Sequence, residues 1–346
     1  MAGLKRVQAN LKRYRASVLK AAREGRLVPT EAELARKEGR SYESGEQLLK
    51  RILKERRAKW EADQSAKMCA EDNPPKNDDW KKKYMEPVAP DTTRLPSLPE
   101  GWAWAAWEQI GFSQNGRSFP SSEYCDRGVK LLRPGNLAPS GRVEWTEKNT
   151  RCMPLIWERE NPDLVVGRNE LIMNLTAQSL KDEFLGRVCM TSADDHCLLN
   201  QRLARLTPVL ANSRYLLWMF KASVFRRFVD GLNKGSLIQH MFTSQLAAFV
   251  LPLPPMAEQT RIADAVEQSM STIEDDDVTV ERTVRRAERL RQSILKRAFE
   301  GKLVPQDPND ESASVLLERI RAERANASRD GKPDRTKLRR KKTTQA

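Results

Sequence analysis

One stretch of sixteen residues occurs twice in this chain, and it constrains the fold more than any other feature of the sequence. The first copy, residues 14–29, reads YRASVLKAAREGRLVP, and the second, residues 290–305, reads LRQSILKRAFEGKLVP. The two copies are identical at ten of their sixteen positions. A second shared block follows each copy, at residues 48–52 and 316–320. Copies so far apart cannot stack as neighbours in a solenoid, so we expect two equivalent helical elements on either side of a different domain.

The helices that carry the two copies have narrow apolar seams. Residues 4–23 carry apolar side chains in alternating steps of three and four, and the expected seam positions are Leu4, Leu11 and Val18. In residues 258–299 an apolar residue recurs at every seventh position, at Val266, Ile273, Val280, Ala287 and Ile294. A helix with so narrow a seam needs a partner helix, so we expect these two helices to pair along their seams. The acidic run at residues 274–277 leaves a kink in the second helix open as an alternative.

The region between the helices has the pattern of a mixed domain. Short apolar runs broken by turns predict strands at residues 129–133, 164–174, 186–190 and 203–207, and helical spacing predicts one helix over residues 215–231. The expected fold class is therefore α+β, with one mixed α/β domain flanked by long helices. Three tryptophans, Trp102, Trp104 and Trp107, lack interleaved basic residues, which favours a core anchor over a platform for stacking bases.

These patterns divide the chain into five parts. A first helical region with a second helix over residues 45–61 is expected to precede a polar, proline-containing linker. The mixed domain and a second helical region follow, and the basic end of the chain is expected to be disordered. The expected boundaries are 1–61, 62–95, 96–257, 258–325 and 326–346.

The charge of the chain favours a polyanionic partner. Its 61 Lys and Arg residues exceed its 47 Asp and Glu residues, giving a formal net charge of +14. Such an excess favours nucleic acid, because basic side chains neutralise phosphates and release their counterions. The five cysteines have no C-x-x-C spacing, which is typical of reduced cytoplasmic thiols. No apolar run approaches the length of a membrane span or a secretory signal, so we expect a cytoplasmic protein without a membrane partner.

No catalytic, metal or cofactor site is predicted. The only histidines, His196 and His240, cannot supply a metal cluster or a proton relay. Phosphate-loop and nucleophile-elbow motifs are absent from the sequence. Residues 73–76, NPPK, are similar to the base-binding loop of amino-group DNA methyltransferases, but Lys76 replaces the aromatic residue that stacks on the base. The acidic pairs at residues 182–183 and 194–195 lack the suitably spaced lysine of a nuclease site. We therefore interpret the chain as a binding protein.

Several motifs together carry a resemblance to a known family. They are LPEGW at residues 98–102, the turn-strand-turn at 128–136, GRNEL at 167–171, GR at 186–187, GS…H at 235–240 and LPLPPMAEQ at 251–259. With the repeated SxLKxAxEGxLVP element, they resemble the specificity subunits of type I restriction-modification systems. The resemblance covers residues 4–60 and 97–323.

The resemblance implies a non-catalytic, sequence-specific subunit that uses no cofactor. Its target-recognition domain would read one half of a bipartite double-stranded DNA site. Its helices would pair as an antiparallel coiled coil, act as a spacer and dock methyltransferase (M) subunits, and through them the restriction (R) subunit. The family has two recognition domains and this sequence has one. We therefore expect either that an amino-terminal recognition domain is lacking or that a half-subunit works as a homodimer or with a second half-subunit.

Polar and basic residues on the turns between strands are the predicted DNA contacts. Lys and Arg would contact phosphates, and polar side chains on exposed turns would read base edges in the major groove. The predicted contacts are Arg117, Ser118, Lys130, Arg133, Asn136, Gln178, Ser179, Lys234 and Ser236. The alternative hypothesis is a non-enzymatic coiled-coil assembly or scaffold protein whose basic charge is incidental.

Overall fold

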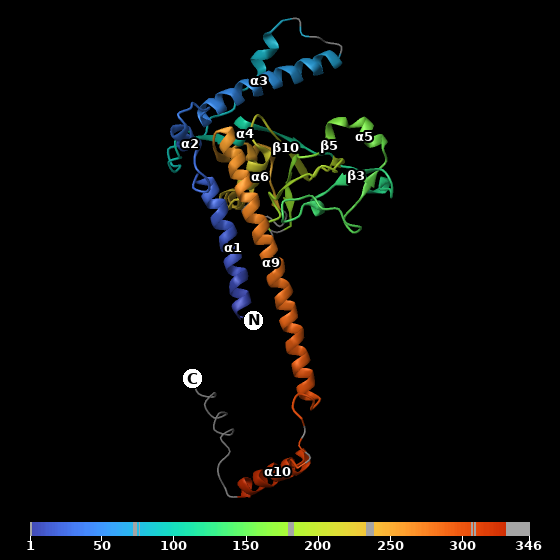
Figure 1. Ribbon diagram of the computed structural model, residues 1–346. Coiled ribbons are helices and arrows are strands. Elements are labelled where there is room, and N and C mark those ends of the chain that lie inside the picture. Colours follow the sequence, from blue (N-terminus) through green and yellow to red (C-terminus); the bar gives the residue numbers. More distant parts are fainter. Residues whose placement is uncertain are drawn as a thin grey trace, which may run out of the picture. The chain divides into compact units, whose positions relative to one another are not determined.

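The computed structural model describes residues 2–71, 75, 77–178, 183–232, 239–305, 307 and 309–329 (Figure 1). These residues divide into two compact units, residues 2–279 and residues 280 onward, and each is described by itself. Strands and long helices are combined in the first unit, so the α+β class is confirmed. No helix among the described residues is long and apolar enough to cross a membrane.

Two four-stranded sheets form the middle of the first unit. The first has the order β2-β10-β6-β8 and is antiparallel throughout. The second has the order β4-β3-β9-β5, in which β3 and β9 are parallel. The strands of these sheets are β2 (Gly111–Asn115), β3 (Val129–Leu132), β4 (Cys152–Met153), β5 (Val165–Val166), β6 (Leu171–Asn174), β8 (Val188–Met190), β9 (Cys197–Leu199) and β10 (Leu203–Pro208).

Two strand pairs and several short helices complete this part of the chain. The pairs are β1 (Ala103–Ala106) with β12 (Val250–Leu253), and β7 (Thr176–Ala177) with β11 (Gln239–His240). The short helices are α4 (Trp107–Ile110), α5 (Ile156–Glu160), α6 (Ser213–Lys221), α7 (Ser223–Leu232) and α8 (Thr243–Ala247). Single 3-10 turns lie at η1 (Asp79–Lys83), η2 (Ser121–Glu123), η3 (Pro134–Asn136) and η4 (Pro162–Leu164).

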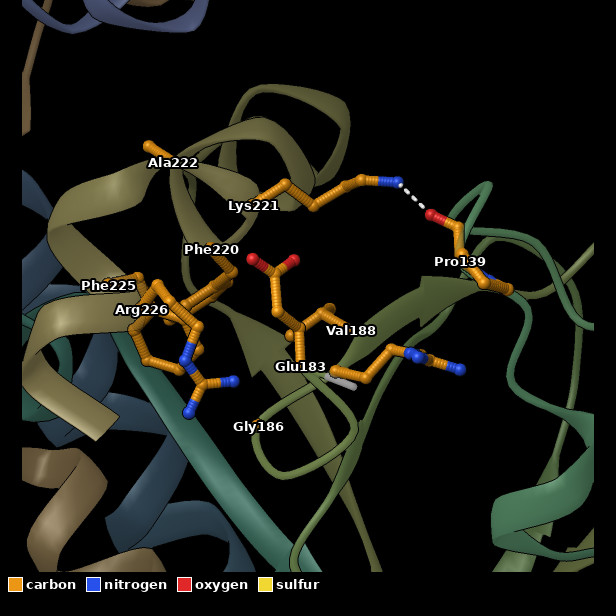
Figure 2. Close-up of a pocket in the computed structure, with 10 residues that line it drawn as sticks. Pro139, Glu183, Gly186, Val188, Phe220, Lys221, Ala222, Phe225 and Arg226 are labelled. Carbon is orange, nitrogen blue, oxygen red and sulfur yellow. Dashed lines mark hydrogen bonds between the residues drawn. The ribbon is translucent and has the colours of Figure 1, made fainter. Parts of the chain in front are cut away.

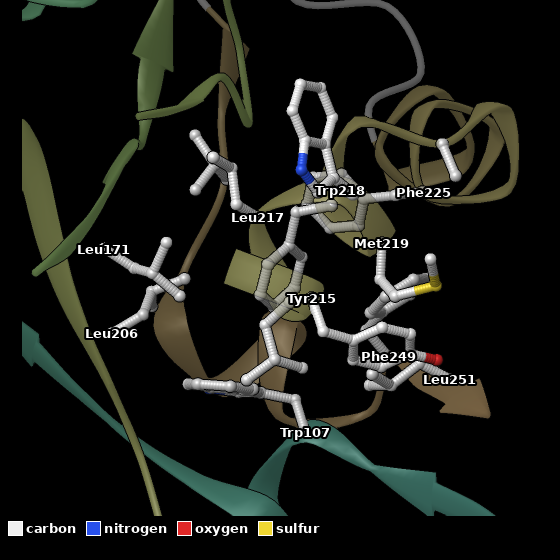
Figure 3. Packing of buried hydrophobic residues seen from close by; sticks show 14 of the residues in the cluster. Trp107, Leu171, Leu206, Tyr215, Leu217, Trp218, Met219, Phe225, Phe249 and Leu251 are labelled. Atoms are coloured by element: carbon white, nitrogen blue, oxygen red, sulfur yellow. The ribbon is translucent and has the colours of Figure 1, made fainter. Parts of the chain in front are cut away.

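The main core lies between the first sheet and the helices. Buried side chains of α6 and of the β8–β12 region pack against Trp107, and Tyr215 donates its hydroxyl hydrogen to the Pro252 carbonyl oxygen at 2.8 Å (Figure 3). Trp102 and Trp107 are buried as predicted, and Trp104 is half-buried. Trp102 and Trp107 therefore anchor the core, whereas Trp104 lies outside the hydrophobic cluster.

The predicted helix over residues 215–231 is wrong in one respect, because it is two helices. Ala222 has an extended backbone, with φ −71° and ψ 150°, and separates α6 from α7. The break lets the rings of Phe220 and Phe225 meet edge to face at 5.1 Å, and both rings also contact Phe249. The contacts among these three rings therefore favour two helices over the single helix that the apolar spacing predicts.

The first repeat copy packs onto the junction between the domain and the long helix. It lies on α1 (Ala2–Arg23) and the following turn, and α2 (Glu31–Glu38) and α3 (Gly45–Ala70) come next. Val18, Leu19 and Ala22 are buried, as are Leu48 and Ile52 of the second shared block. Gly25, with φ +66°, approaches Pro99 and Trp102 so closely that a Cβ there would lie 2.4 Å from Pro99 Cγ. The repeat is therefore a docking element for the domain.

One buried carboxylate joins three distant segments at this junction. Glu258 accepts hydrogen bonds from the Trp102 indole N–H at 2.9 Å and from the Glu31 backbone N–H at 2.8 Å. Next to it, Gln259 accepts a hydrogen bond from the Asn212 backbone N–H at 2.9 Å. The LPEGW and PMAEQ motifs meet the end of the first repeat copy at this point.

Helix α9 (Met256–Phe299) is continuous through the acidic run, so the alternative of a kink does not apply. Its first part runs beside α1 in the opposite direction (Figure 1), and Arg15 forms an ion pair with Asp277 at 3.3 Å. Of the predicted seam, Val18, Val266 and Ile273 are buried, and Leu11 packs against the same core. Leu4 is half-buried.

The second unit consists of the end of α9 and α10 (Ala313–Arg329). Its apolar side chains are largely exposed. Val280 and Ala287 are half-buried, whereas Ile294 is 45% exposed and Leu316 is 41% exposed. Helix α10 includes residues 326–329 of the tail that was expected to be disordered, and residues 330–346 lie outside the described part of the chain.

Helix α3 extends beyond residue 61, the predicted end of this helix, to Ala70. Trp60, just before this extension, stacks with Trp80 at 6.0 Å and contacts Tyr84 at 5.2 Å. Ring contacts across the segment therefore hold part of the expected linker against the helix. Of the NPPK segment, only Pro75 belongs to the described residues.

Candidate nucleic-acid interface

Three of the predicted DNA contacts lie around the second sheet, and each is placed over an aromatic ring. The Arg117 guanidinium lies 5.3 Å from the centre of the Trp157 ring. Lys130 Nζ lies 4.9 Å from the centre of the Trp145 ring, and the Arg133 guanidinium lies 5.8 Å from that of Tyr124. A ring attracts a cation without neutralising its charge. These side chains are therefore held in place while they remain available to an anion.

The aromatic rings are themselves fixed by the fold. Trp157 packs edge to face against buried Phe119 at 5.3 Å and donates its indole N–H to Glu123 at 2.7 Å. Trp145 donates its indole N–H to Asp195 at 2.6 Å. Since these two tryptophan rings have hydrogen-bonded positions, Arg117 and Lys130 above them are restrained too.

Arg117 and Ser118 are the first residues of this surface in the sequence. Both are exposed, and they directly precede buried Phe119. Arg117 also donates to the Asn161 side-chain oxygen at 2.6 Å. A neutral partner orients the guanidinium and leaves its charge uncompensated, which suits a phosphate contact.

Asn136 has a structural task in the turn after Arg133. It is 1% exposed, and its side-chain oxygen accepts a hydrogen bond from the Arg133 backbone N–H at 2.9 Å. Its amide nitrogen donates to the Glu144 carbonyl oxygen at 3.2 Å. A buried amide that holds its own turn cannot reach a base edge, so Asn136 supports the position of Arg133 and is left out of the interface.

Gln178 lies at a second place on the domain. Gln178 is exposed directly after β7, whose partner strand β11 follows the 233–238 segment. The structure therefore brings the ends of these two segments together. Ser179, Lys234 and Ser236 lie outside the described residues.

The groups weighed for catalysis have ordinary structural surroundings. His196 is exposed and hydrogen-bonds Glu158 at 2.7 Å, and the His240 ring contacts the Thr176 hydroxyl at 3.2 Å. Burial raises the pKa of Cys189 to about 12 and also raises that of Cys197, so neither thiol is ionised near neutral pH. Within the described ranges, no group of three or more His, Cys, Asp or Glu side chains is placed to hold a metal ion.

The aromatic partners of the basic residues were missed from the sequence. Trp145, Trp157 and Tyr124 stand 15, 40 and 9 positions from the cations they contact, at Lys130, Arg117 and Arg133. The pairing of β3 with β4 and β9 and the bridge between Arg117 and Asn200 bring these separated parts of the chain together. A weak signal existed, because tryptophan in a polar, charged stretch such as residues 144–148 is unusual for a core position.

Comparison with known proteins gives a consistent set of relatives. The chain is 26% identical over 270 residues to the type I restriction enzyme EcoAI specificity subunit of Escherichia coli, covering 77% of this chain and 41% of that protein. It is 40% identical over 231 residues to the EcoKI specificity subunit of Escherichia coli strain K12, covering 65% and 48%. The chain thus spans about half the length of the curated relatives it matches.

The chain is also similar to a solved structure. A chain from a structure describing complex assembly and conformational transition of the type I R-M system matches with a TM-score of 0.49 and 19% identity. That match covers 75% of this chain and 57% of the other. No family model matches the chain.

Proposed function

We propose that this chain, an HsdS-like relative of the type I restriction enzyme specificity subunits, reads one half of a bipartite DNA site and does no catalysis itself. In this proposal the domain between the repeat copies binds double-stranded DNA. The helices carry the methyltransferase subunits and, through them, the restriction subunit. The relatives are named as specificity subunits of type I restriction enzymes, and the half-site and the bound subunits follow from the resemblance of the motifs.

The observation that carries DNA binding is the set of cations held over aromatic rings on the second sheet. Arg117, Lys130 and Arg133 each lie over an aromatic ring, and none of them forms an ion pair with a carboxylate of the described residues. Phosphate contacts of this kind set the position of a protein on DNA. Exposed Ser118 and Gln178 are then the described polar side chains proposed to read base edges. Ser179, Lys234 and Ser236 stay proposed on the sequence pattern alone.

The long helices are proposed to pair as an antiparallel coiled coil. The Arg15–Asp277 ion pair and the shared burial of Val18, Val266 and Ile273 support pairing of α1 with the first part of α9. The same seam continues on α9 at Val280, Ala287 and Ile294. This exposed continuation is proposed as part of the surface that binds a methyltransferase subunit.

The second repeat copy is proposed to dock a second recognition domain. In the first copy the apolar residues of the repeat are buried against Trp102 and the start of α9. Their counterparts in the second copy are exposed, with Leu295 at 46%, Leu316 at 41% and Leu317 at 52%. A contiguous exposed apolar surface indicates a protein interface.

One residue favours a second half-subunit over a homodimer. Gly45 starts α3, and a Cβ at this position would lie 2.2 Å from the Leu253 carbonyl oxygen and 2.9 Å from the Ala103 nitrogen. The matching position of the second copy, at the start of α10, is Ala313. A methyl group there collides with the backbone of a domain docked in the same way. The domain that covers the second copy is therefore proposed to differ from this one at that contact.

Selection from a randomised duplex pool tests DNA reading. The chain is mixed with type I methyltransferase subunits, and bound duplexes are sequenced. We expect enrichment of one short half-site. Absence of any enriched sequence, with the methyltransferase subunits bound, would contradict the proposal and favour a scaffold protein. Turnover of DNA by the chain alone, with cofactor or metal, would contradict the non-catalytic role.

Replacing Lys130 tests the proposed surface. Lys130→Ala should weaken binding to the enriched duplex and reduce the salt slope by about one for the lost phosphate contact. Lys37→Ala, on the exposed face of α2, is the control and should change neither quantity. An unchanged slope for Lys130→Ala removes that residue from the interface.

Replacing Ala313 tests the identity of the second domain. If Gly45 is required for docking of this chain's own domain, Ala313→Gly should increase self-association in sedimentation velocity, whereas the unsubstituted chain stays monomeric. Equal self-association of both proteins would contradict the steric argument.

A further inference from the structure

A pocket lined by cationic side chains lies on the domain, and none of its residues belongs to the interface described above. It has a volume of about 190 Å³ and lies between the turn at residues 139–141, the β7–β8 connection and the junction of α6 with α7 (Figure 2). Three cations line it, Arg187, Lys221 and Arg226, together with one carboxylate, Glu183. Phe220 and Phe225 form its apolar floor.

Lys221 is held at the pocket by neutral groups. Its Nζ donates to the Pro139 carbonyl oxygen at 2.9 Å and to the Ser140 carbonyl oxygen at 2.6 Å. Gly141 permits this approach, because it has φ +94° and a Cβ there would lie 2.7 Å from Lys221 Nζ. Carbonyl oxygens orient an ammonium group without cancelling its charge.

The two arginines are oriented by backbone carbonyls as well. Arg187 donates to the Leu137 carbonyl oxygen at 3.1 Å, and Arg226 donates to the Leu185 carbonyl oxygen at 2.8 Å. Arg226 also pairs with Asp230 at 2.9 Å on the next turn of α7. Among the described residues that line the pocket, three side chains are cationic and one is anionic, and burial weakens the screening of their charges by water.

Burial disfavours the charged form of Lys221. Burial lowers the pKa of Lys221 to about 8, although the fields of Cys189 and Glu274 oppose this shift. A bound anion would reverse the penalty, because an opposite charge favours the charged form of a lysine.

We propose that the pocket of Arg187, Lys221 and Arg226 binds a phosphate group of the DNA backbone, and that the Glu183 carboxylate occupies it when DNA is absent. Figure 2 shows this carboxylate directed into the pocket between Lys221 and Arg226. The inference rests on the proposed function, since it assigns one more contact to the same DNA-binding domain. Of the pocket residues, Glu183, Gly186 and Arg187 precede β8 in the described part of the chain.

Replacing the lysine and the glutamate should change DNA binding in opposite directions. At 0.1 M salt, Lys221→Met should lower affinity for the enriched duplex about tenfold and reduce the salt slope by about 0.9, the value for one phosphate. Glu183→Gln should raise affinity, because the competing carboxylate charge is lost. The matched controls are Lys37→Met and Glu46→Gln, both exposed on the first helical region, and neither should change affinity.

The salt slope separates a phosphate contact from a structural role. A lysine that only holds the turn at residues 139–141 would change the melting temperature and leave the slope unchanged. Should Lys221→Met melt below the assay temperature, Arg187→Met serves for the same comparison.

The outcomes distinguish this proposal from the proposed function. If the unsubstituted chain binds the enriched duplex and the pocket variants bind it with equal affinity and slope, the pocket proposal alone is overturned. If the unsubstituted chain with its methyltransferase subunits binds no duplex, both are overturned. If inorganic phosphate stabilises the unsubstituted chain but not Lys221→Met, while both bind DNA equally, the pocket takes a free anion and the assignment to DNA is overturned.

Discussion

The two copies of the repeat have nearly the same sequence and opposite surroundings. In the first copy, Leu19 and Leu48 are buried against Trp102 and the start of α9. In the second, the matching residues Leu295 and Leu316 are exposed. The helices form in both copies, since their periodicity and capping are local. Burial of the apolar face, however, needs a domain packed against it. The difference teaches that the repeat is an adaptor whose stability depends on the domain placed against it.

The largest test of this comparison is truncation of one leucine in each copy. Leu48→Ala removes a side chain that is fully buried and should lower the free energy of unfolding by about 2–5 kcal/mol. Leu316→Ala, at the matching exposed position, should change it by no more than about 0.5 kcal/mol. Denaturant unfolding measures both. Equal losses would show that the second copy is already covered within the chain.

The next test exchanges the residues at the helix starts. Gly45→Ala should destabilise the chain by about 1–3 kcal/mol, because the added methyl group meets backbone atoms that cannot move aside easily. Ala313→Gly should cost no more than about 1 kcal/mol, the difference in helix propensity. Thermal unfolding of the two variants gives the comparison. A harmless Gly45→Ala substitution would mean that the docked domain adapts to the repeat.

A smaller effect on stability is expected from Glu31, which lies between the two shared blocks of the first copy, and a pH titration should show it. Burial raises the pKa of Glu31, but hydrogen bonds from Arg40 and Arg261 outweigh it, so the pKa lies below its usual value. The ionised form therefore stabilises the folded chain above the ordinary carboxyl pKa, and this stabilisation is lost as pH falls through the folded-state pKa. Stability of Glu31→Gln should fall less steeply in this acid range than that of the unsubstituted chain. Parallel curves would remove Glu31 from the docking contact.

The smallest expected effect concerns the ion pair between the helices. Arg15 and Asp277 are both partly exposed, so Arg15→Ala should cost no more than about 1 kcal/mol, and the cost should shrink with added salt. Unfolding at low and high salt measures this. A loss of several kcal/mol that does not depend on salt would mean that the helices depend on this contact rather than on their apolar seam.

Local patterns predicted the parts of the fold that depend on neighbouring residues. The strands at residues 129–133 and 203–207 and the long helix α9 follow from apolar periodicity. Helix α2 was not predicted, although Thr30 and Glu33 form a capping box that is readable in the sequence. The break at Ala222 was not readable, because Phe249, which shapes it, comes from a segment 27 positions further along.

The candidate site was predictable to a lesser degree. The basic residues were predicted from their type and their place near turns, and the structure has Lys130 on β3 and Arg133 directly after it. Their aromatic partners depend on strand pairing, which a single sequence does not specify. Asn136 was misjudged because its polar side chain serves its own turn. Lys221, which we propose to bind a phosphate, was not among the predicted contacts because it lies on a helix rather than on a turn.

The bonds of Glu258 have a consequence for how the protein is made. This carboxylate holds Glu31, which precedes it by 227 positions, and Trp102, which precedes it by 156. Closing loops of that length is slow, and neither contact can form before residue 258 has left the ribosome. The first repeat copy therefore waits, with its apolar face uncovered, until synthesis of the domain is complete. A nascent chain stopped before α9 is expected to be a substrate for chaperones and proteases, so quality control acts on the same surface that later serves assembly.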